Sequence, residues 1–438
     1  MDVRDKLELL GRAAQFEYDE CNGQGATVGL AGGRNTYGSP AAPPDRPDML
    51  ADGRGLFAPT ETDRPTGRDV FPYISHITVP GCGRRSILKV LQTSACQNDC
   101  RYCAFRSGRD FRRTGFTPDE LAKAFDLMYR SGAVQGMFLS SGVAGTNRSM
   151  DEMLATVELV RGRYDFRGYV HLKILPGVEA AQIARAVELA DRVSVNLEAP
   201  NAQRLEILAP QKQMAQLVGP LRAAAQVIQE HSQWADRDRD WRRPRRMGPL
   251  MGLRNSGLAG WTQLGMTTQF VVGPAGESDK ELLATAESLY RQVGLARAYY
   301  SAFSPVADTP LESIPPTDPR REYRLYQADF LLRYYRFSAE ELPFDPVGRL
   351  PERLDPKAAW AQKHPERFPV EVNKAPVAEL MRVPGIGPVS AQAIAEGRRK
   401  GTIRGLGDLR RLGARAHEAA PYVLLAGKRP PYQPPLPL

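Results

Sequence analysis

The sequence predicts an α/β fold, a partial (β/α)6 barrel of the TIM-like type, followed by a small all-α domain at the C-terminus. Between about residues 86 and 310, six short apolar runs rich in β-branched residues alternate with longer helical stretches. In two of these runs, apolar and polar residues alternate, which gives each strand one polar face. After residue 370, short helical stretches are broken by Gly and Pro.

The N-terminal region, residues 1–80, is expected to hold one helix and a partly ordered segment. The start, "MDVRDKLELLGRAAQFEYDE", reads as a short amphipathic helix, and residues 21 to about 72 are rich in Gly, Pro, Asp and Arg. The start lacks the apolar core of a signal peptide, and nowhere do about 18 apolar residues run together. We therefore expect a cytoplasmic protein with no membrane partner, in which clustered cysteines bind metal or do chemistry.

Residues 81–310 are expected to form the barrel. The six expected strands lie in "SILKVLQTS", "VQGMFLSSG", "RGYVHLKILPG", "DRVSVNLEAP", "MTTQFVVGP" and "ARAYYSAFSP". In "VSVNLE", Ser194, Asn196 and Glu198 share one face, and in "YVHLKI" the polar face carries His171 and Lys173. Strands of an open doubly wound sheet are apolar on both faces, so the alternation favours a barrel with a polar lumen. Functional groups are then expected in the lumen and at the carboxyl ends of the strands.

Three of the five cysteines crowd into "LQTSACQNDCRYCAFR", just past the first of these strands: Cys96, Cys100 and Cys103. Thiolates are soft ligands that suit zinc or iron–sulfur clusters. Three of them could hold three irons of a cubane and leave the fourth iron open to a small molecule. The alternative is a closed four-thiolate zinc site that recruits Cys82 or Cys21.

The triplet, with Tyr102 directly before its last cysteine, and the strand alternation that follows resemble the radical S-adenosylmethionine (SAM) enzymes over about residues 86–310. The resemblance implies a [4Fe-4S] cluster on the three cysteines, with SAM bound at the open iron. One electron, from a donor such as flavodoxin or ferredoxin, would then cleave SAM to a 5′-deoxyadenosyl radical that abstracts a substrate hydrogen. The cofactor supplies this chemistry, and the protein supplies orientation and a dry cavity.

The same resemblance implies which residues contact SAM. "SSG" ends the second strand where the family presents small residues to the methionine amino group, although it departs from the family's usual Gly-Gly-Glu. "VVGPAGES" and "YYSAFSP" resemble adenine-side segments. The pair His171 and Lys173 is a candidate for substrate or SAM carboxylate contact, with a hydrogen-bonded structural pair as the alternative. The implied cofactor-binding residues are Tyr102, Ser140, Ser141, Gly142, Lys173, Asn196 and Glu198.

Residues 311–369 are expected to form a helical extension and connector. "RREYRLYQADFLLRYYRFSAEEL" is strongly periodic, and its aromatic residues recur every three or four positions. We expect this stripe to pack in a core and not to stack on bases. It comprises Tyr323, Tyr326, Phe330 and Tyr334.

Residues 370–438 carry "NKAPVAELMRVPGIGPVSAQAIAEGRRKGTIRGLGDLRRLG". A first helix with Asn373 as its cap is broken by "PGIG", and a second begins with Pro388. The two glycines allow a phosphate to approach closely, and the N-terminus of the second helix attracts an anion. The pattern resembles the helix-hairpin-helix module, with a degenerate second hairpin. The implied DNA-phosphate contacts are Gly385, Ile386 and Gly387, with Arg398, Arg399 and Lys400 adding charge; the alternative is a module used only for packing or protein contact.

The charge distribution agrees with a polyanionic partner. The chain has a net charge of +9, and residues 366–438 contain 12 Lys/Arg against 6 Asp/Glu. A second basic cluster, "DRDRDWRRPRRM", is either a solvated loop or a guide that leads the phosphate backbone to the barrel mouth. Its central arginines are Arg242, Arg243, Arg245 and Arg246.

Together, the barrel motifs, "TTQFVVG", "YQADFLLRYYRF" and the terminal hairpin resemble a group of radical SAM proteins assigned to DNA modification or repair, whose members are associated with a uracil-DNA-glycosylase-like protein. We therefore expect an enzyme that modifies or repairs a nucleotide in DNA, which must be flipped or single-stranded to reach the cavity. The alternatives are a radical SAM enzyme that modifies tRNA or another RNA, one that acts on a protein or small molecule, and a non-catalytic iron–sulfur or zinc DNA-binding protein.

Overall fold

The computed structural model describes residues 2–14, 74–79, 83–237 and 265–432. The chain divides into two compact units. Of the described residues, the second unit takes 278–287 and 319–432, and the first unit takes all the others. Several residues singled out in the sequence lie outside the described residues: Cys21, Cys82, Arg242, Arg243, Arg245 and Arg246.

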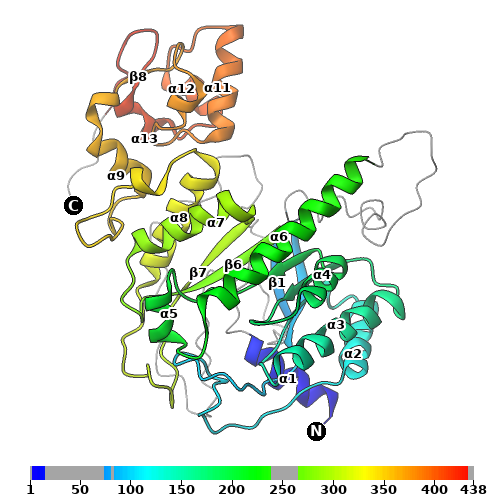
Figure 1. Ribbon diagram of the computed structural model, residues 1–438. Coiled ribbons are helices and arrows are strands. Elements are labelled where there is room, and N and C mark those ends of the chain that lie inside the picture. Colours follow the sequence, from blue (N-terminus) through cyan, green and yellow to red (C-terminus); the bar gives the residue numbers. More distant parts are fainter. Residues whose placement is uncertain (1, 15–73, 80–82, 238–264, 433–438) are drawn as a thin grey trace, which may run out of the picture. The chain divides into compact units, whose positions relative to one another are not determined.

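A sheet forms the centre of the first unit (Figure 1). It has seven strands, which lie in sequence order from β1 to β7. The strands are β1 Ile74–Val79, β2 Gly83–Leu91, β3 Gly136–Ser140, β4 Tyr169–Lys173, β5 Arg192–Ser194, β6 Gly265–Val272 and β7 Arg297–Ala302. From β2 to β7 each strand pairs in parallel with the next. Right-handed crossovers in this order place all helices on one face, whereas a doubly wound sheet reverses its order. The predicted partial barrel of six parallel strands is confirmed.

Strand β1 was not expected. It pairs antiparallel with β2, in a register that opposes Ile74 to Leu88 and Val79 to Gly83. The β-branched residues of β1 directly follow the Gly- and Pro-rich stretch, and the composition of that stretch gave no indication of a strand. The strand adds an antiparallel edge to the parallel sheet, a common arrangement in α/β folds.

The crossover helices follow the strands as expected. The helices before residue 319 are α1 Val3–Ala14, α2 Pro118–Arg130, α3 Thr146–Gly162, α4 Ala180–Leu189, α5 Ala202–Leu208, α6 Met214–Arg237 and α7 Asp279–Val293. Helix α7 contributes residues to both units. Thr117 and Glu120 start α2 with a capping box, in which each side chain bonds the backbone N–H of the other residue. No helix in the described ranges is long and apolar enough to cross a lipid bilayer.

A buried ion pair stabilises the edge of the sheet where the parallel strands begin. Arg161, at the end of α3, pairs with Asp191 at 3.0 Å, and both side chains are largely buried. The same guanidinium donates hydrogen bonds to the carbonyls of Phe166, Gly168 and Leu189. These contacts tie α3 to the segments that lead into β4 and β5. Charged groups at this end of a strand barrel serve stability, because chemistry takes place at the opposite edge.

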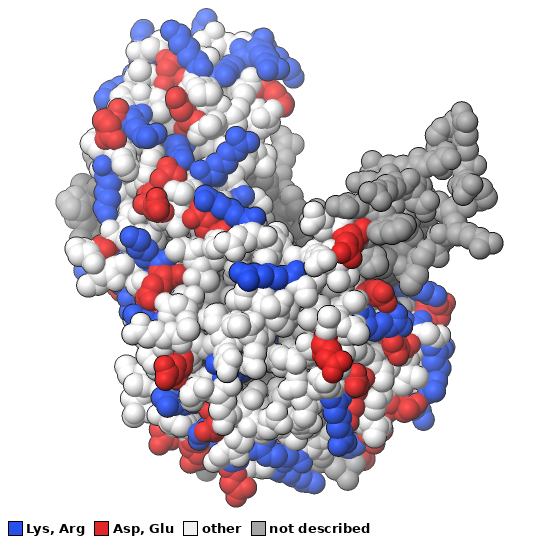
Figure 2. Space-filling view, viewed as in Figure 1, with Lys and Arg blue, Asp and Glu red and all other residues white. Residues whose placement is uncertain are grey.

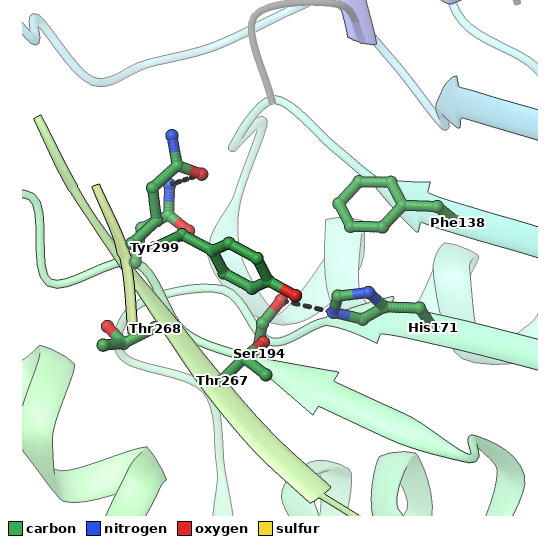
Figure 3. A pocket seen from close by; sticks show the side chains of 8 residues that line it. Phe138, His171, Ser194, Thr267, Thr268 and Tyr299 are labelled. Atoms are coloured by element: carbon green, nitrogen blue, oxygen red, sulfur yellow. Dashed lines mark hydrogen bonds between the residues drawn. The ribbon is translucent and has the colours of Figure 1, made fainter. Parts of the chain in front are cut away.

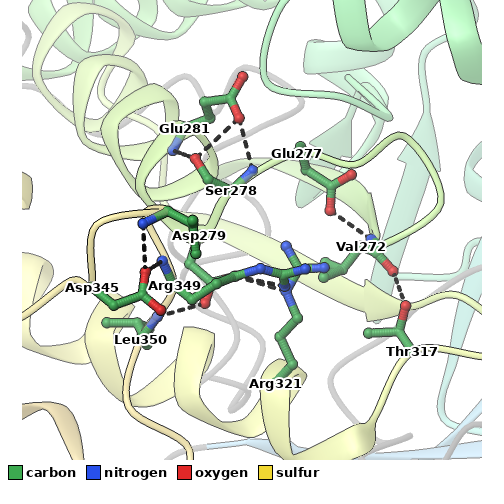
Figure 4. Close-up of polar contacts among 12 residues, drawn as sticks. Val272, Glu277, Ser278, Asp279, Glu281, Thr317, Arg321, Asp345, Arg349 and Leu350 are labelled. Atoms are coloured by element: carbon green, nitrogen blue, oxygen red, sulfur yellow. Dashed lines mark hydrogen bonds and ion pairs between the residues drawn. The ribbon is translucent and has the colours of Figure 1, made fainter.

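In the second unit, the first turn of α7 packs against α8 and the loop that follows it. Asp279 is 2% exposed and accepts bonds from Arg321 at 2.7 Å and from the Leu350 N–H at 2.8 Å (Figure 4). The Asp345 side chain accepts hydrogen bonds from the N–H groups of Val347 and Arg349, and these bonds stabilise the turn in this loop. The second unit also contains 3₁₀ turns and the elements α8 Pro319–Tyr334, α9 Pro356–Lys363, β8 Val370–Glu371, α10 Val377–Leu380, α11 Pro388–Lys400, α12 Leu406–Arg411, α13 Ala416–Ala419 and β9 Val423–Leu424.

One expectation for this unit was confirmed in part and another was wrong. In the aromatic stripe of α8, Tyr326 is 5% exposed and Tyr323 and Phe330 are half-buried, but Tyr334 is 51% exposed. The buried face also includes Asp329, which is paired with Arg333 at 2.7 Å, and a hydrophobicity pattern cannot register a buried ion pair. Asn373 does not cap a helix, because α10 begins only at Val377 and the Asn373 amide bonds the backbone of Ile403.

Candidate functional site

The three clustered cysteines lie in a long loop between β2 and α2, which we call the cysteine loop (residues 92–117). This position is the carboxyl edge of the parallel strands, as predicted. Cys96, Cys100 and Cys103 are free thiols, of which Cys100 is buried. The Cys103 N–H donates to the Cys100 carbonyl at 3.1 Å, and the Phe105 N–H donates to Cys103 Sγ at 3.4 Å. An N–H aimed at the sulfur favours the thiolate form that binds metal.

Neighbouring segments hold the cysteine loop from two sides. The Gln97 N–H donates to the carbonyl of Val143, after β3, at 2.7 Å. The Arg101 N–H donates to the carbonyl of Leu208, at the end of α5, at 2.8 Å. Backbone groups that flank the thiols are thus bonded to segments from opposite sides of the loop. The loop is built into the first unit and does not extend freely into solvent.

A buried ion pair lies beside the cysteines. Lys212 Nζ contacts Glu198 Oε1 at 3.0 Å, and the side chains are 11% and 4% exposed. Glu198 follows β5 in the left-handed backbone region, at φ 64°, which is rare for a non-glycine residue and typical of functional sites. Its second oxygen, Oε2, is buried, and no described group bonds to it. The carboxylate therefore has hydrogen-bonding capacity left for another group.

The electrostatics of this region suit a metal group that is held by anionic thiolates. Burial raises the pKa of the Cys100 and Cys103 thiols, so without metal they hold their protons at neutral pH. Burial works against the charge of Lys212, yet the adjacent Cys100 sulfur in its thiolate form and the Glu198 carboxylate raise the pKa of this lysine above its usual range. The ammonium group is therefore a permanent positive charge next to sulfurs that become anionic on binding metal.

Replacing Lys212 with Met is expected to destabilise the metal-free chain by about 3–5 kcal/mol, because it leaves the Glu198 carboxylate buried without its counter-ion. The double variant Lys212→Met/Glu198→Leu should recover most of this loss. Thermal unfolding of the single and double variants measures both effects. The matched control is Arg185→Met, which removes exposed pairs with Glu158 and Glu188 and should cost no more than about 1 kcal/mol. A single variant as stable as the parent chain would contradict the assignment.

A small polar pocket lies on the inner face of the strands (Figure 3). As predicted, polar residues of successive strands share this face. His171 Nε2 contacts Ser194 Oγ at 2.9 Å, and Tyr299 points toward both (Figure 3). Burial, and then the cations of Arg192, Lys173 and Lys89, lower the pKa of His171 well below its usual value, so this imidazole is neutral at neutral pH. The pocket residues are Phe138, His171, Ser194, Asn196, Thr267, Thr268, Gln269 and Tyr299.

The structure brings most of the expected cofactor-binding residues to the carboxyl edge of the parallel strands. Gly142 donates its N–H to the Thr93 carbonyl at 2.7 Å, and a Cβ there would lie 2.2 Å from the Ala95 carbonyl oxygen, so only glycine fits against the cysteine loop. Ser140 is fully buried and accepts the Gln92 N–H. Ser141 is half-buried and donates its hydroxyl to the Gly142 carbonyl.

The remaining expected cofactor-binding residues divide between the cysteine loop and the pocket. Lys173, at the end of β4, and Lys212 hold the pKa of Glu198 below its usual value although burial raises it. Burial, and then the Glu198 carboxylate, raise the pKa of Tyr102, which places this phenol close to Glu198. Asn196 lies in the pocket, 3.4 Å from the Gln269 amide oxygen. Lys212 was not among the expected residues, because no local pattern distinguishes it from a solvated lysine.

In the second unit, "PGIG" forms a tight hairpin before α11. Gly385 has φ 76°, and a Cβ there would lie 2.5 Å from the Arg415 carbonyl oxygen, which belongs to the second hairpin. Ile386 is fully buried in the core, and the Gly387 N–H donates to Ser390 Oγ at 2.8 Å. In the first turn of α11, Pro388 has no N–H, and the Ala391 N–H donates to the Gly387 carbonyl at 2.8 Å. The N–H groups of Val389 and Ser390 have no partner within the helix, and such groups attract an anion. Val389, in this turn, is 60% exposed.

The basic triplet expected near this hairpin lies at the other end of α11. The helix runs from Pro388 to Lys400, so its two ends are separated by about 18 Å at 1.5 Å per residue. Arg398 donates to the carbonyls of Val372 and Ala375, at 3.1 and 2.6 Å, and so links the end of α11 to the segment before α10. Arg399 and Lys400 are exposed. Positive side chains are frequent on the surface of this unit (Figure 2).

A buried cation that the sequence did not indicate contacts the hairpin from α9. Lys357 is 7% exposed, and its Nζ donates to the Ile386 carbonyl at 2.5 Å. The same ammonium lies 4.6 Å from the centroid of the Tyr335 ring. The hairpin is therefore supported by the connector as well as by its own module.

Two family models match the chain. The model described as "Radical SAM superfamily" matches residues 90–227, and the model described as "Helix-hairpin-helix motif" matches residues 367–421. The first match contains the three cysteines, Glu198 and Lys212, and the second contains both hairpins. The chain thus carries a radical SAM superfamily domain and a helix-hairpin-helix motif. Enzymes of the radical SAM superfamily use a [4Fe-4S] cluster and SAM.

Several solved structures are similar to part of the chain. The maturase HydG of [FeFe]-hydrogenase is 12% identical, with a TM-score of 0.40, over 55% of this chain and 48% of its own. Methylornithine synthase (PylB) is 12% identical, with a TM-score of 0.40, over 55% of this chain and 60% of its own. A radical SAM methyltransferase from Sphaerobacter thermophilus is 14% identical, with a TM-score of 0.39, over 58% of this chain and 65% of its own. The chain therefore spans less than two thirds of each of these proteins. No curated protein matched the sequence.

The residues of the site fit these cofactors. Three free thiols supply the three soft ligands that a cubane with one open iron needs. The carboxylate of Glu198, which lies near the Tyr102 phenol, keeps room at its buried Oε2 to accept the hydroxyl or ammonium groups of a small molecule. In the described residues, no group of three or more His, Cys, Asp or Glu side chains is arranged to hold a single metal ion.

Proposed function

We propose that this chain, which carries a radical SAM superfamily domain and a helix-hairpin-helix motif, is an enzyme that modifies or repairs a nucleotide in DNA. The observation that carries the proposal is the occurrence, in one chain, of a three-thiol loop at the carboxyl edge of a barrel and a hairpin module that offers backbone N–H groups to phosphate. The first feature supports the chemistry, and the second supports the class of substrate. The nucleic-acid partner and the identity of the substrate are both proposals.

In the first unit, we assign the cysteines to the cluster and the adjacent charged residues to SAM. Cys96, Cys100 and Cys103 would hold the cluster, which supplies the electron for reductive cleavage of SAM. Glu198 Oε2 would accept hydrogen bonds from SAM, and Lys212 keeps Glu198 ionised and in place. Tyr102, Ser140, Ser141, Gly142, Lys173 and Asn196 are proposed to complete the wall of this site.

The pocket on the inner face of the strands is too small to hold a nucleotide, so its groups would form part of the wall that faces a substrate. The hydroxyls of Ser194 and Thr267 and the amide of Gln269 are hydrogen-bonding groups, and Phe138 and Tyr299 are apolar walls. His171 is neutral there, so it can hold a hydrogen bond without adding charge. Enclosure by the sheet would keep water from a reactive intermediate.

In the second unit, the hairpin before α11 would bind the phosphate backbone. Its N–H groups and the helix dipole attract an anion of any sequence, and exposed arginines and lysines add a salt-dependent attraction. A base inside a duplex cannot enter a barrel lumen, so the substrate would be flipped out or single-stranded. The interaction would position DNA without reading its sequence.

Anaerobic reconstitution with iron, sulfide, dithionite and SAM tests the proposal. We expect 5′-deoxyadenosine to form and its rate to rise when single-stranded or damaged DNA is added, with a changed nucleoside detected by mass spectrometry. Stimulation by tRNA alone would favour the RNA-modifying alternative. No SAM cleavage with the cluster fully reduced would favour a non-catalytic DNA-binding protein.

Two further partners follow from the same proposal. A radical SAM enzyme needs an electron donor, and a flavodoxin or ferredoxin in the cytoplasm would serve. A uracil-DNA-glycosylase-like protein is proposed as an associated protein, on the resemblance of the whole chain to the DNA repair group. Co-purification of tagged protein from cells, with and without nuclease treatment, distinguishes a direct partner from one bridged by DNA.

A further inference from the structure

The two ends of the cysteine loop are paired with each other. The Ser94 N–H donates to the Thr114 carbonyl at 2.9 Å, and the Phe116 N–H donates to the Gln92 carbonyl at 2.9 Å. An antiparallel bridge joins Thr93 to Gly115 between them. The last residues of the loop therefore run back along its first residues and close it at its base. The hydrogen bonds made inside this closed loop therefore determine whether the loop keeps its shape.

The guanidinium of Arg113 lies inside the loop. It donates hydrogen bonds to five backbone carbonyls, at distances from 2.8 to 3.4 Å: those of Ser94, Phe105, Arg106, Ser107 and Arg109. The guanidinium also lies 4.4 Å from the centroid of the Phe111 ring. One side chain thus bonds the stretch before the first cysteine and the stretch after the last one.

This arrangement depends on the shape of arginine. A guanidinium has five N–H donors in a rigid planar fork, whereas a lysine ammonium has three donors on a single atom. Backbone carbonyls that turn inward need a donor, because a polar group without one is costly when it is taken out of water. Without Arg113, the carbonyls would turn outward to water and the loop would open.

Two neighbouring arginines strengthen the same region in a more local way. Arg106 pairs with Asp99 at 2.6 Å. Arg109 donates to the Ala104 carbonyl at 3.2 Å and to the Ala307 carbonyl, after β7, at 3.1 Å. Arg112, directly before Arg113, is exposed. The chain therefore provides a matched control one residue away from the central arginine.

We propose that Arg113 is a positioning residue that holds the cysteine loop folded before metal arrives, so that the three thiols are gathered in advance. The proposal rests on the assignment of the cysteines to a cluster and is independent of the nature of the substrate. Because hydrogen bonds to backbone carbonyls do not involve the thiols, the loop keeps its shape in the metal-free chain. Preformed ligands lower the ordering cost that metal binding must otherwise meet.

Hydrogen exchange of the full-length chain, prepared with and without iron and sulfide, tests the proposal. In the metal-free chain, Arg113→Gln should speed amide exchange in residues 94–109 about tenfold or more, since several hydrogen bonds are lost together, and leave β3 to β7 unchanged. Arg113→Lys should behave like Arg113→Gln, because it keeps the charge but not the fork. Arg112→Gln should exchange like the parent chain.

The metal-loaded chain gives a second readout. We expect Arg113→Gln and Arg113→Lys to lose iron on gel filtration and to broaden the electron paramagnetic resonance signal of the reduced cluster. Arg112→Gln should keep its iron and show the same signal as the parent chain. Unchanged exchange in Arg113→Gln would overturn the proposal, and so would full rescue by Arg113→Lys, which would leave only a charge effect. Faster exchange throughout the first unit would also overturn it, because it would show a general role in stability. None of these outcomes depends on activity toward DNA.

Discussion

Replacing Cys100 with Ala is expected to abolish binding of the iron–sulfur cluster and to lower reductive SAM cleavage by at least about a thousandfold, because the cofactor carries the chemistry. Cys100 is the buried member of the triplet, and its sulfur lies next to the Lys212 ammonium. Its loss removes one of three ligands and leaves a buried cation near the gap. We therefore expect a larger effect than for Cys96, which is half-buried.

Iron and sulfide content, the visible absorbance of the cluster and 5′-deoxyadenosine formation measure this effect together. Ser107→Ala is the matched control, since Ser107 is exposed in the same loop and only its backbone carbonyl contacts Arg113. It should keep both cluster and activity. A Cys100→Ala chain that retains a full cluster, or a parent chain that binds one zinc ion and no iron, would refute the metal assignment.

The sequence predicted the barrel because its signals are local. Six short apolar runs alternate with helical stretches, two of the runs also show period-two alternation, and each run can be recognised by itself. Features that a hydrophobicity pattern does not record were missed or misread. Strand β1 was hidden by the composition before it, and the inner face of α8 includes Asp329, whose charge is offset by Arg333.

The same division applies to the site. Cys96, Cys100 and Cys103 are separated by a few residues, so their spacing alone predicted a metal site. Lys212 reaches that site from another crossover, and the five carbonyls that surround Arg113 are backbone groups that no side-chain motif records. In the second unit, the basic triplet was expected near the hairpin, but α11 carries it to the far end of the helix.

Replacing Gly385 with Ala is expected to destabilise the hairpin module by about 2–5 kcal/mol, from the left-handed backbone and the overpacked contact together. The backbone at Gly385 has φ 76°, which alanine adopts only at a cost. The added Cβ would lie 2.5 Å from the Arg415 carbonyl oxygen and 3.0 Å from Glu418 Cβ. Because the first contact is with backbone, the two hairpins must move apart. The N–H groups in the first turn of α11 would then lose the arrangement that we propose binds phosphate.

Gly407→Ala is the matched control in the same module. Gly407 lies in α12, a Cβ there would meet nothing within 4 Å, and the change should stabilise the module by about 0.5–1 kcal/mol. Hydrogen exchange across α10 and α11 measures stability, and fluorescence anisotropy with labelled single-stranded and duplex DNA measures binding. We expect Gly385→Ala to lower DNA affinity at least about tenfold, as the loss of even one or two charge-assisted contacts would, and Gly407→Ala to leave it unchanged. If Gly385→Ala loosens the hairpin and DNA still binds with full affinity, the module serves packing or protein contact, and the nucleic-acid interface must lie elsewhere on the chain.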